Sequence, residues 1–153
     1  MIQALKLYEN AKIQKQQILS ENKGKSGIYK WINKINGKFY IGSAVDLQIR
    51  LAYYYSKKSM ENSLKKSKSA IYSAILKHGQ SNFKLEILEY CSAKKCVKLE
   101  QKHINLLKPS YNILPIAGSR LGSIVSGETR AKISACVALK KVKIIRCVLL
   151  TSG

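Results

Sequence analysis

The stretch Ser26–Ser43, SGIYKWINKINGKFYIGS, decides the fold of this chain. It consists of two runs that loosely alternate apolar and polar residues, with Asn36-Gly37 between them. Asn-Gly between two such runs is the strongest short-range hairpin signal, because both residues accept the positive φ of a type I′ turn. The sequence therefore predicts two antiparallel strands, at about 27–35 and 38–43.

The predicted hairpin brings two tyrosines together. Folding the ribbon at its turn places Tyr29 and Tyr40 near one another on the sheet, and the apolar anchors of the two runs are Ile28, Ile32 and Ile35. Tyrosine is common in strands, so an ordinary sheet would also show this pattern. The hairpin alone does not decide between a structural and a functional interpretation.

The formal net charge of this 153-residue chain is +20. A hydrophobic fraction of 46% is typical of a folded protein, here with room for one core and an extended tail. So large a positive charge indicates a polyanionic partner, usually nucleic acid; the alternative is a solvated lysine-rich surface without a partner. The basic residues are 24 Lys and 4 Arg. Lys, Ile, Asn and Tyr are favoured by AT-rich codons, which points to an organelle or phage genome.

The sequence lacks the marks of secretion and of membrane insertion. Scattered polar residues occupy the N-terminus where a secretory signal has an apolar core, and no apolar run approaches the length of a membrane span. Neither a Cys-x-x-Cys pair nor a zinc-ligand spacing of histidines is present. We therefore expect free thiols in a reducing compartment, no membrane partner and no small-molecule cofactor. The cysteines are Cys91, Cys96, Cys136 and Cys147.

The first predicted helix follows the hairpin. Asp46 is a suitable N-cap, and one face of this helix carries Leu47, Arg50, Leu51 and Tyr54. We expect a loop at 56–69 after it. The loop has five lysines, which are either merely solvated or contact a nucleic-acid backbone: Lys57, Lys58, Lys65, Lys66 and Lys68.

Three further elements complete the pattern. They are a helix at 70–78, a strand at 83–90 and a helix at 92–107 with Ser92 as its N-cap. The order of elements predicts a small α+β domain, in which an antiparallel sheet of three strands is flanked by helices.

Two charged residues lie on stripes that should face the core. Glu100 shares a helical face with Val97, Ile104 and Leu107, and Arg50 shares one with two leucines. A core-facing carboxylate is costly unless a cation or hydrogen bonds compensate it, and the arginine fork suits phosphate. The structural alternatives are a Glu paired with a nearby Lys and an Arg whose charged end reaches solvent. Facing each other beside the hairpin, the two stripes would form a pocket.

Gly27-Ile28-Tyr29 and Tyr40-Ile41-Gly42 resemble the defining motif of the GIY-YIG nuclease superfamily. The similarity continues, in register, through Ser43–Leu47 with Arg50, Ala70–Phe83, Leu99–Gln101 and Lys108–Ile113. It runs from about Gly24 to Leu114 and is greatest to the intron-encoded homing endonucleases of fungal mitochondria.

The resemblance implies roles for individual residues. Glu100 would hold one Mg²⁺ ion per active site, and Arg50 would stabilise negative charge developing on the phosphate. Tyr29 would act as general base or orient the attacking water, its phenol acidified by nearby positive charge. The other implied site residues are Tyr40 at the phosphate or its waters, Tyr54 where relatives carry His or Tyr, Gly42 for close approach of the backbone, and Asn112 as a brace.

The resemblance also suggests how the chain is divided. We expect a basic leader at 1–24, helical in part, the GIY-YIG-like domain at 25–114, and a linker with a truncated tail at 115–153. Gly118–Ser134 is similar to the small DNA-binding module that follows many such nuclease domains. The DNA contacts expected in this tail are Arg120, Arg130 and Lys132.

The leading hypothesis is a magnesium-dependent endonuclease that acts as a monomer on double-stranded DNA and promotes the spread of an intron. We expect it to be encoded in the mitochondrion, because the N-terminus lacks an import peptide, with chloroplast or phage-infected cytoplasm as the second choice. The alternatives are a non-cleaving binder (a decayed nuclease or an intron maturase), a ribosome-associated or structural basic protein, and a repair-type nuclease.

Overall fold

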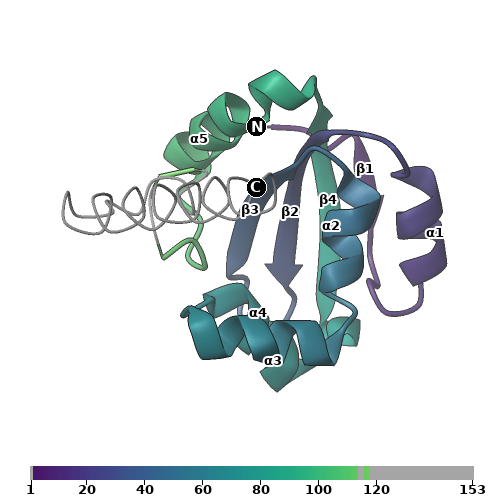
Figure 1. The fold of residues 1–153 in the computed structure, drawn as a ribbon, viewed down its shortest axis with the longest axis vertical. Coiled ribbons are helices and arrows are strands. Elements are labelled where there is room, and N and C mark those ends of the chain that lie inside the picture. The colour runs from purple at the N-terminus through teal and green to yellow at the C-terminus, as the bar shows by residue number, and fades with distance from the viewer. Residues whose placement is uncertain (1, 114–115, 118–153) are drawn as a thin grey trace, which may run out of the picture. The chain divides into compact units, whose positions relative to one another are not determined.

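The computed structural model describes residues 2–113, 116 and 117. In that part, four strands form one antiparallel sheet in the order β1-β4-β2-β3 (Figure 1). They are β1 (Lys6–Tyr8), β2 (Gly27–Asn33), β3 (Phe39–Ala44) and β4 (Phe83–Tyr90). The predicted α+β class with helices flanking an antiparallel sheet is confirmed, with one strand more than expected.

The additional strand comes from the residues expected to form a leader. β1 pairs with β4, with Tyr8 opposite Leu85, and α1 (Lys15–Glu21) follows it. Tyr8 and Ile18 are buried in the core beneath. A strand of three residues is too short to show an alternating pattern, so the sequence revealed only the helical part of this segment.

The hairpin forms, but its turn differs from the prediction. The two strands are closed by a bond from Asn33 N to Lys38 O, so the loop has four residues. A type I′ turn needs positive φ at both of its central residues. Gly37 has φ +70°, but Asn36 does not have positive φ, because Lys108 is the one described non-glycine residue that does. The turn is therefore not type I′. The Asn33 side chain accepts from Ile35 N and stabilises the wider loop. Ile35, expected as an apolar anchor, is therefore 60% exposed.

The helices on the hairpin side agree with the sequence except in one segment. Asp46 caps α2 (Leu47–Tyr53) by accepting from Ile49 N, and α4 (Ala70–His78) ends at Gly79, as predicted. The expected loop at 56–69 is wrong, because α3 (Lys57–Lys66) lies there. The apolar side of α3 consists of Met60, which is buried, and Leu64, which is partly buried. Two apolar residues in ten are too few to show the helical periodicity in the sequence.

The last helix begins later than predicted. A 3₁₀ turn (Ala93–Lys95) precedes α5 (Cys96–Leu107), and no side chain caps either element. Ser92 is thus not the N-cap of the α-helix. The inward stripe is also shifted, since Cys96 is buried whereas Val97 is 49% exposed. Glu100 and Ile104 remain on the buried side.

The sheet separates two apolar clusters. One cluster, which includes Tyr29, Trp31, Leu47 and Tyr72, lies on the face covered by α2, which crosses the front of the sheet in Figure 1. The other, which includes Ile28, Ile41 and Ile104, lies on the face toward α5. Cys91 and Cys96 are free thiols, and no helix among the described residues has the length and apolarity to cross a membrane.

Candidate active site

Strand β3 is the edge of the sheet, and side chains of both of its faces contribute to the candidate site. Tyr40, Gly42 and Ala44 point toward α2, whereas Phe39, Ile41 and Ser43 point toward α5, as the two clusters show. Tyr29 on β2 lies opposite Gly42. The site is therefore assembled around one edge strand.

Arg50 lies on the α2 face inside a group of tyrosines. Its Nε donates to the Tyr29 hydroxyl at 3.1 Å, its Nη1 donates to the Tyr72 hydroxyl at 3.0 Å, and its guanidinium lies 5.4 Å from the centre of the Tyr54 ring. The hydroxyls of Tyr29 and Tyr54 share a hydrogen bond of 3.0 Å. The Tyr29 and Tyr40 rings are 6.3 Å apart, so the predicted approach of these two residues is confirmed. We call Tyr29, Tyr40, Tyr54 and Tyr72 the tyrosine cluster.

Gly42 makes room for this cluster. A Cβ atom at this position would lie 2.6 Å from the Tyr29 hydroxyl and 2.8 Å from the Tyr40 ring. Neither contact is tolerable for real atoms, so any side chain here would displace the two tyrosines. The family resemblance implied that this glycine allows close approach of a backbone. In the structure, the groups closest to it are the side chains of Tyr29 and Tyr40.

Glu100 lies on the other face of β3. It is 9% exposed, and its Oε2 accepts a hydrogen bond of 2.5 Å from the Ser43 hydroxyl. Among the described residues, the Ser43 hydroxyl is the one hydrogen-bond partner of this carboxylate. Burial raises the pKa of Glu100, while the Ser43 hydrogen bond and the Arg50 charge lower it.

Arg50 and Glu100 are opposite charges that do not neutralise each other. Within the described part of the chain, neither takes part in an ion pair. Removing a charge from water without a partner costs several kcal/mol, so such groups are retained where an external ligand compensates them. The positive charge of Arg50 is suited to an anion, and the negative charge of Glu100 is suited to a cation.

The donor set at Glu100 fits the magnesium ion that the resemblance implies. Mg²⁺ prefers hard oxygen ligands and keeps several of its waters, so one carboxylate plus a substrate phosphate suffices. In residues 2–113, 116 and 117 no group of three or more His, Cys, Asp or Glu is placed to hold a metal. A single-carboxylate site, with Ser43 orienting the carboxylate, is the arrangement that these residues provide.

Tyr29, Tyr40 and Tyr54 are neutral at physiological pH. Burial raises the pKa of Tyr29, and the Arg50 charge lowers it by less; burial likewise raises the pKa values of Tyr40 and Tyr54. The expectation that nearby positive charge acidifies the Tyr29 phenol is therefore wrong in its net direction, because removal from water outweighs the charge. Arg50 keeps its full charge in the middle of the cluster.

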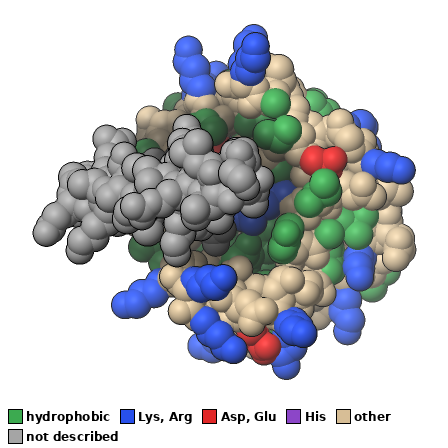
Figure 2. All heavy atoms as spheres, viewed as in Figure 1, with side chains coloured by type: hydrophobic (Ala, Val, Ile, Leu, Met, Phe, Trp, Pro, Cys, Tyr) green, Lys and Arg blue, Asp and Glu red, His purple; other side chains and the backbone are tan. Residues whose placement is uncertain are grey.

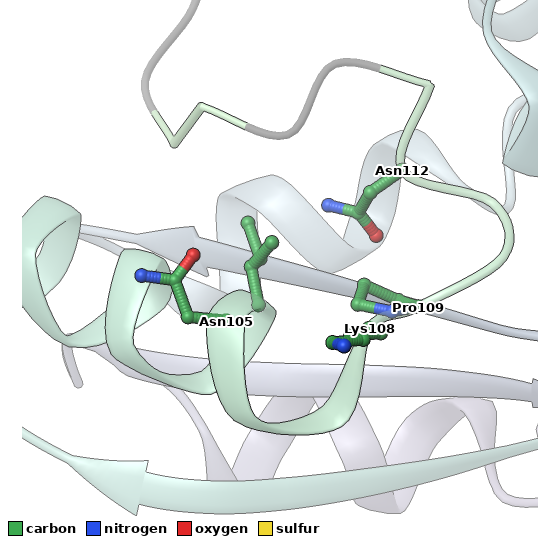
Figure 3. Close-up of a pocket in the computed structure, with 5 residues that line it drawn as sticks. Asn105, Lys108, Pro109 and Asn112 are labelled. Atoms are coloured by element: carbon green, nitrogen blue, oxygen red, sulfur yellow. The ribbon is translucent and has the colours of Figure 1, made fainter.

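Asn112 lies on the segment that follows α5. Its Oδ1 accepts from Ile41 N and its Nδ2 donates to Ile41 O, both at 2.9 Å. Figure 3 shows Asn112 across from Asn105 and Lys108, and these residues line a groove with Ile104 and Pro109. None of the tyrosine cluster lines this groove. Asn112 thus holds β3 in place rather than entering the tyrosine cluster.

The five lysines of the expected loop are all exposed, and four of them lie on α3. Figure 2 shows Lys and Arg side chains gathered at the end of the molecule where α3 lies in Figure 1. Arg120, Arg130 and Lys132 lie outside the described residues.

Two residues of the site escaped the sequence reasoning. Tyr72 lies within the helix predicted at 70–78, but the apolar spacing that marked this helix did not indicate that its hydroxyl contacts Arg50. Ser43 carried a usable signal, because alternation along β3 places it on the side of the sheet opposite Gly42. That side faces the helix of Glu100.

Comparison with known proteins agrees with this geometry. Residues 25–112 match the GIY-YIG catalytic domain. Probable intron-encoded endonuclease 1 of Neurospora crassa is 37% identical over 129 residues, which are 78% of this chain and 40% of that protein. Probable intron-encoded endonuclease bI1 of the same organism is 33% identical over 113 residues, 69% of this chain and 24% of that protein.

A solved structure is also similar. The catalytic domain of intron endonuclease I-TevI, solved as a point mutant, superposes with a TM-score of 0.50 and 30% identity over 61% of this chain and 97% of that chain. The chain spans less than half the length of the two curated relatives. The family match covers more than half of this chain and includes every residue of the candidate site from Tyr29 to Asn112, so the chain belongs to the GIY-YIG family.

Proposed function

We propose that this protein is a magnesium-dependent DNA endonuclease of the intron-homing type. The observation that carries the proposal is the pair of half-buried Arg50 and buried Glu100, opposite charges on either face of the edge strand β3 that form no ion pair with any described residue. A phosphodiester supplies the anion that Arg50 lacks, and a hydrated Mg²⁺ supplies the cation that Glu100 lacks. The family and the names of the Neurospora relatives support the same activity.

Hydrolysis requires that a water oxygen attack phosphorus while the bridging P–O bond breaks. Arg50 would bind the non-bridging oxygens and balance the added negative charge. Tyr29, with its raised pKa, suits the role of orienting the attacking water better than that of a phenolate base. When bound at Glu100, the metal ion would supply Lewis-acid stabilisation of the leaving oxygen.

The remaining site residues would act around this centre. Tyr40 would bond to the scissile phosphate or its waters, and Tyr54 would support Tyr29 through their shared hydrogen bond. Asn112 would keep β3, and hence Tyr40, in position through its two bonds to Ile41.

Double-stranded DNA is the substrate that the charge and the family favour. The net charge of +20 supports binding to a polyanion, and exposed lysines on and after α3 are suited to phosphate contacts: Lys57, Lys58, Lys65, Lys66 and Lys68. Arg120, Arg130 and Lys132 would add contacts from the tail. We propose a monomer that is encoded and active in the mitochondrion, since the matched relatives are intron-encoded proteins of a fungus.

The experiment is cleavage of intron-free organellar DNA with Mg²⁺ or with chelator. The native chain is compared with Glu100→Gln, which removes the ligand charge at constant size, and with Glu9→Gln, which removes an exposed carboxylate on the leader. Magnesium-dependent cutting that is lost only in Glu100→Gln supports the proposal. A native chain that shifts the DNA in a gel without cutting it would leave the non-cleaving binder or maturase as the better description.

A further inference from the structure

Tyr72, on α4, accepts a hydrogen bond from the guanidinium of Arg50, which lies on α2. Tyr72 lies in the first turn of α4, where its backbone N–H bonds to the capping Ser69 side chain. The residue is 6% exposed, and its ring meets the Tyr54 ring edge-on with centroids 5.3 Å apart. The ring packing fixes where the hydroxyl lies, and the hydroxyl lies 3.0 Å from Arg50 Nη1.

The Tyr72 contact complements the one made by Tyr29. Tyr29 accepts from Nε on one part of the guanidinium and Tyr72 accepts from Nη1 on another. Two acceptors on different nitrogens, one from the sheet and one from α4, prevent the planar group from turning about the side-chain axis. Without the Tyr72 acceptor, the Nη end of the fork would rotate more readily.

The chemistry of the acceptor matters as much as its place. A carboxylate at this position would bind the fork more strongly, but it would neutralise Arg50 and compete with the phosphate for the same donors. A phenol hydroxyl is a neutral acceptor, so it orients the guanidinium and leaves its charge for the substrate. The described part of the chain supplies Arg50 with hydroxyl acceptors and with no carboxylate at ion-pair distance.

We propose that Tyr72 is a positioning residue for the cleavage reaction, which fixes the Arg50 fork through its hydroxyl in the orientation that meets the scissile phosphate. This inference rests on the proposed nuclease function. Tyr72 is then a further site residue, on α4, beside those of the GIY-YIG motif. It acts through Arg50 and does not itself touch the substrate.

The test compares Tyr72→Phe with Tyr55→Phe. Both variants keep the ring and remove one buried or half-buried hydroxyl, and Tyr55 donates its hydrogen bond to Ala11 O, outside the tyrosine cluster. The single-turnover cleavage rate at saturating protein and the Kd for DNA in chelator are measured. Tyr72→Phe should cleave roughly 10- to 100-fold more slowly, because a misoriented catalytic group costs rate, with the Kd unchanged. Tyr55→Phe should match the native chain in both measurements.

A double-mutant cycle with Arg50→Lys tests whether Tyr72 acts through Arg50. An ammonium has no fork to orient, so Tyr72→Phe should change the residual rate of Arg50→Lys less than about twofold. Equal losses in both backgrounds would overturn the inference, as would a native rate in Tyr72→Phe.

A third measurement does not depend on cleavage. The chain has 4 arginines, so NMR of the Nε and Nη groups can resolve Arg50, assigned by its loss in Arg50→Lys. Rotation of the guanidinium should be slow in the native chain and in Tyr55→Phe, and fast in Tyr72→Phe. An equally slow rotation in Tyr72→Phe contradicts the inference. If rotation responds as expected but the native chain cleaves no DNA, the proposed function fails and the catalytic meaning of the contact fails with it.

Discussion

The side chain of Asn112 bonds to both backbone groups of Ile41, at 2.9 Å each, on the outer edge of β3. An amide that donates and accepts in this way takes the place of a neighbouring strand. Tyr111 N adds a bond to Phe39 O, so this segment pairs with β3 at two points. The strand that carries Tyr40, Gly42 and Ser43 is thereby held from both sides.

Asn112→Ala should remove this support. We expect a loss of about 1–3 kcal/mol in the free energy of unfolding, because both Ile41 groups lose their partner. Urea denaturation measures the change, and the cleavage rate should fall with it. Asn105→Ala, an exposed asparagine on the opposite side of the groove, is the matched control and should unfold like the native chain to within about 0.5 kcal/mol. Equal stability of Asn112→Ala and Asn105→Ala would argue against the bracing role.

Gly42→Ala should damage the site more than the fold. The new Cβ overlaps the Tyr29 hydroxyl and the Tyr40 ring, so the tyrosine cluster must shift, at a cost of about 1–3 kcal/mol in stability. Cleavage should fall by roughly 100-fold or more, because Arg50 loses its place beside Tyr29. Gly24→Ala is the control: its Cβ meets nothing within 4 Å, and only its positive φ is strained. Native cleavage by Gly42→Ala would be incompatible with this account.

Ser43→Ala should lower the affinity of the site for Mg²⁺ without abolishing Mg²⁺ binding. The Ser43 hydroxyl orients Glu100 through a 2.5 Å bond, and loss of such a supporting contact typically lowers metal affinity by about 10- to 100-fold. The Mg²⁺ concentration for half-maximal cleavage should rise accordingly, while the rate at saturating Mg²⁺ changes less. Ser73→Ala, at an exposed position on α4, should leave the Mg²⁺ requirement unchanged. An unaltered requirement in Ser43→Ala would show that Glu100 needs no such support.

The lysines of α3 should set the salt dependence of DNA binding. Lys58→Gln with Lys65→Gln removes two exposed charges, and each lost phosphate contact should reduce the slope of log K against log[salt] by about 0.9. Binding isotherms at several salt concentrations give this slope. Lys12→Gln with Lys23→Gln changes the net charge equally, around α1, and should alter the slope much less. If both pairs lower it equally, the charge acts diffusely and α3 is not a contact surface.

The contacts of Glu21 between α1 and β1 should lose their stabilising effect in acid. Hydrogen bonds from Tyr8, Lys6 and Gln17 lower the pKa of Glu21 from 4.5 to about 2. A lowered folded-state pKa stabilises the fold above the unfolded value, and this contribution is lost as pH falls from about 4.5 to about 2. Urea unfolding over this range should show a steeper loss in the native chain than in Glu21→Gln. Parallel pH profiles would mean that Glu21 does not fasten α1 to β1.

Local signals along the chain predicted much of the fold. The Asn36-Gly37 dipeptide marked the hairpin, the apolar spacing marked α2 and α4, and alternation marked β4, since each depends on neighbours within one or two turns. Where that local signal was weak the prediction failed. β1 has three residues and α3 has only Met60 and Leu64 on its inner side, so their burial against other elements decides them.

The candidate site shows the same division. Tyr29, Tyr40, Arg50 and Glu100 were found from the hairpin, from charges on apolar stripes and from the family resemblance. Val97 was assigned to the inner face of α5, and only packing against β3 selected Cys96 instead. The pKa of Tyr29 also depended on the tertiary structure. Burial of the side chain raises this pKa by more than the Arg50 charge lowers it, and the sequence does not show that burial.

By itself, the sequence determined the residue types, the hairpin, and the helical faces that point Arg50 and Glu100 inward. Only the tertiary structure decided that Tyr72, on a helix beyond α3, closes on Arg50, and that Ser43 meets Glu100 on the opposite side of β3. The physical reason is that periodicity fixes the direction of a side chain relative to its own element. Its partner depends on how that element packs against others far away in the chain.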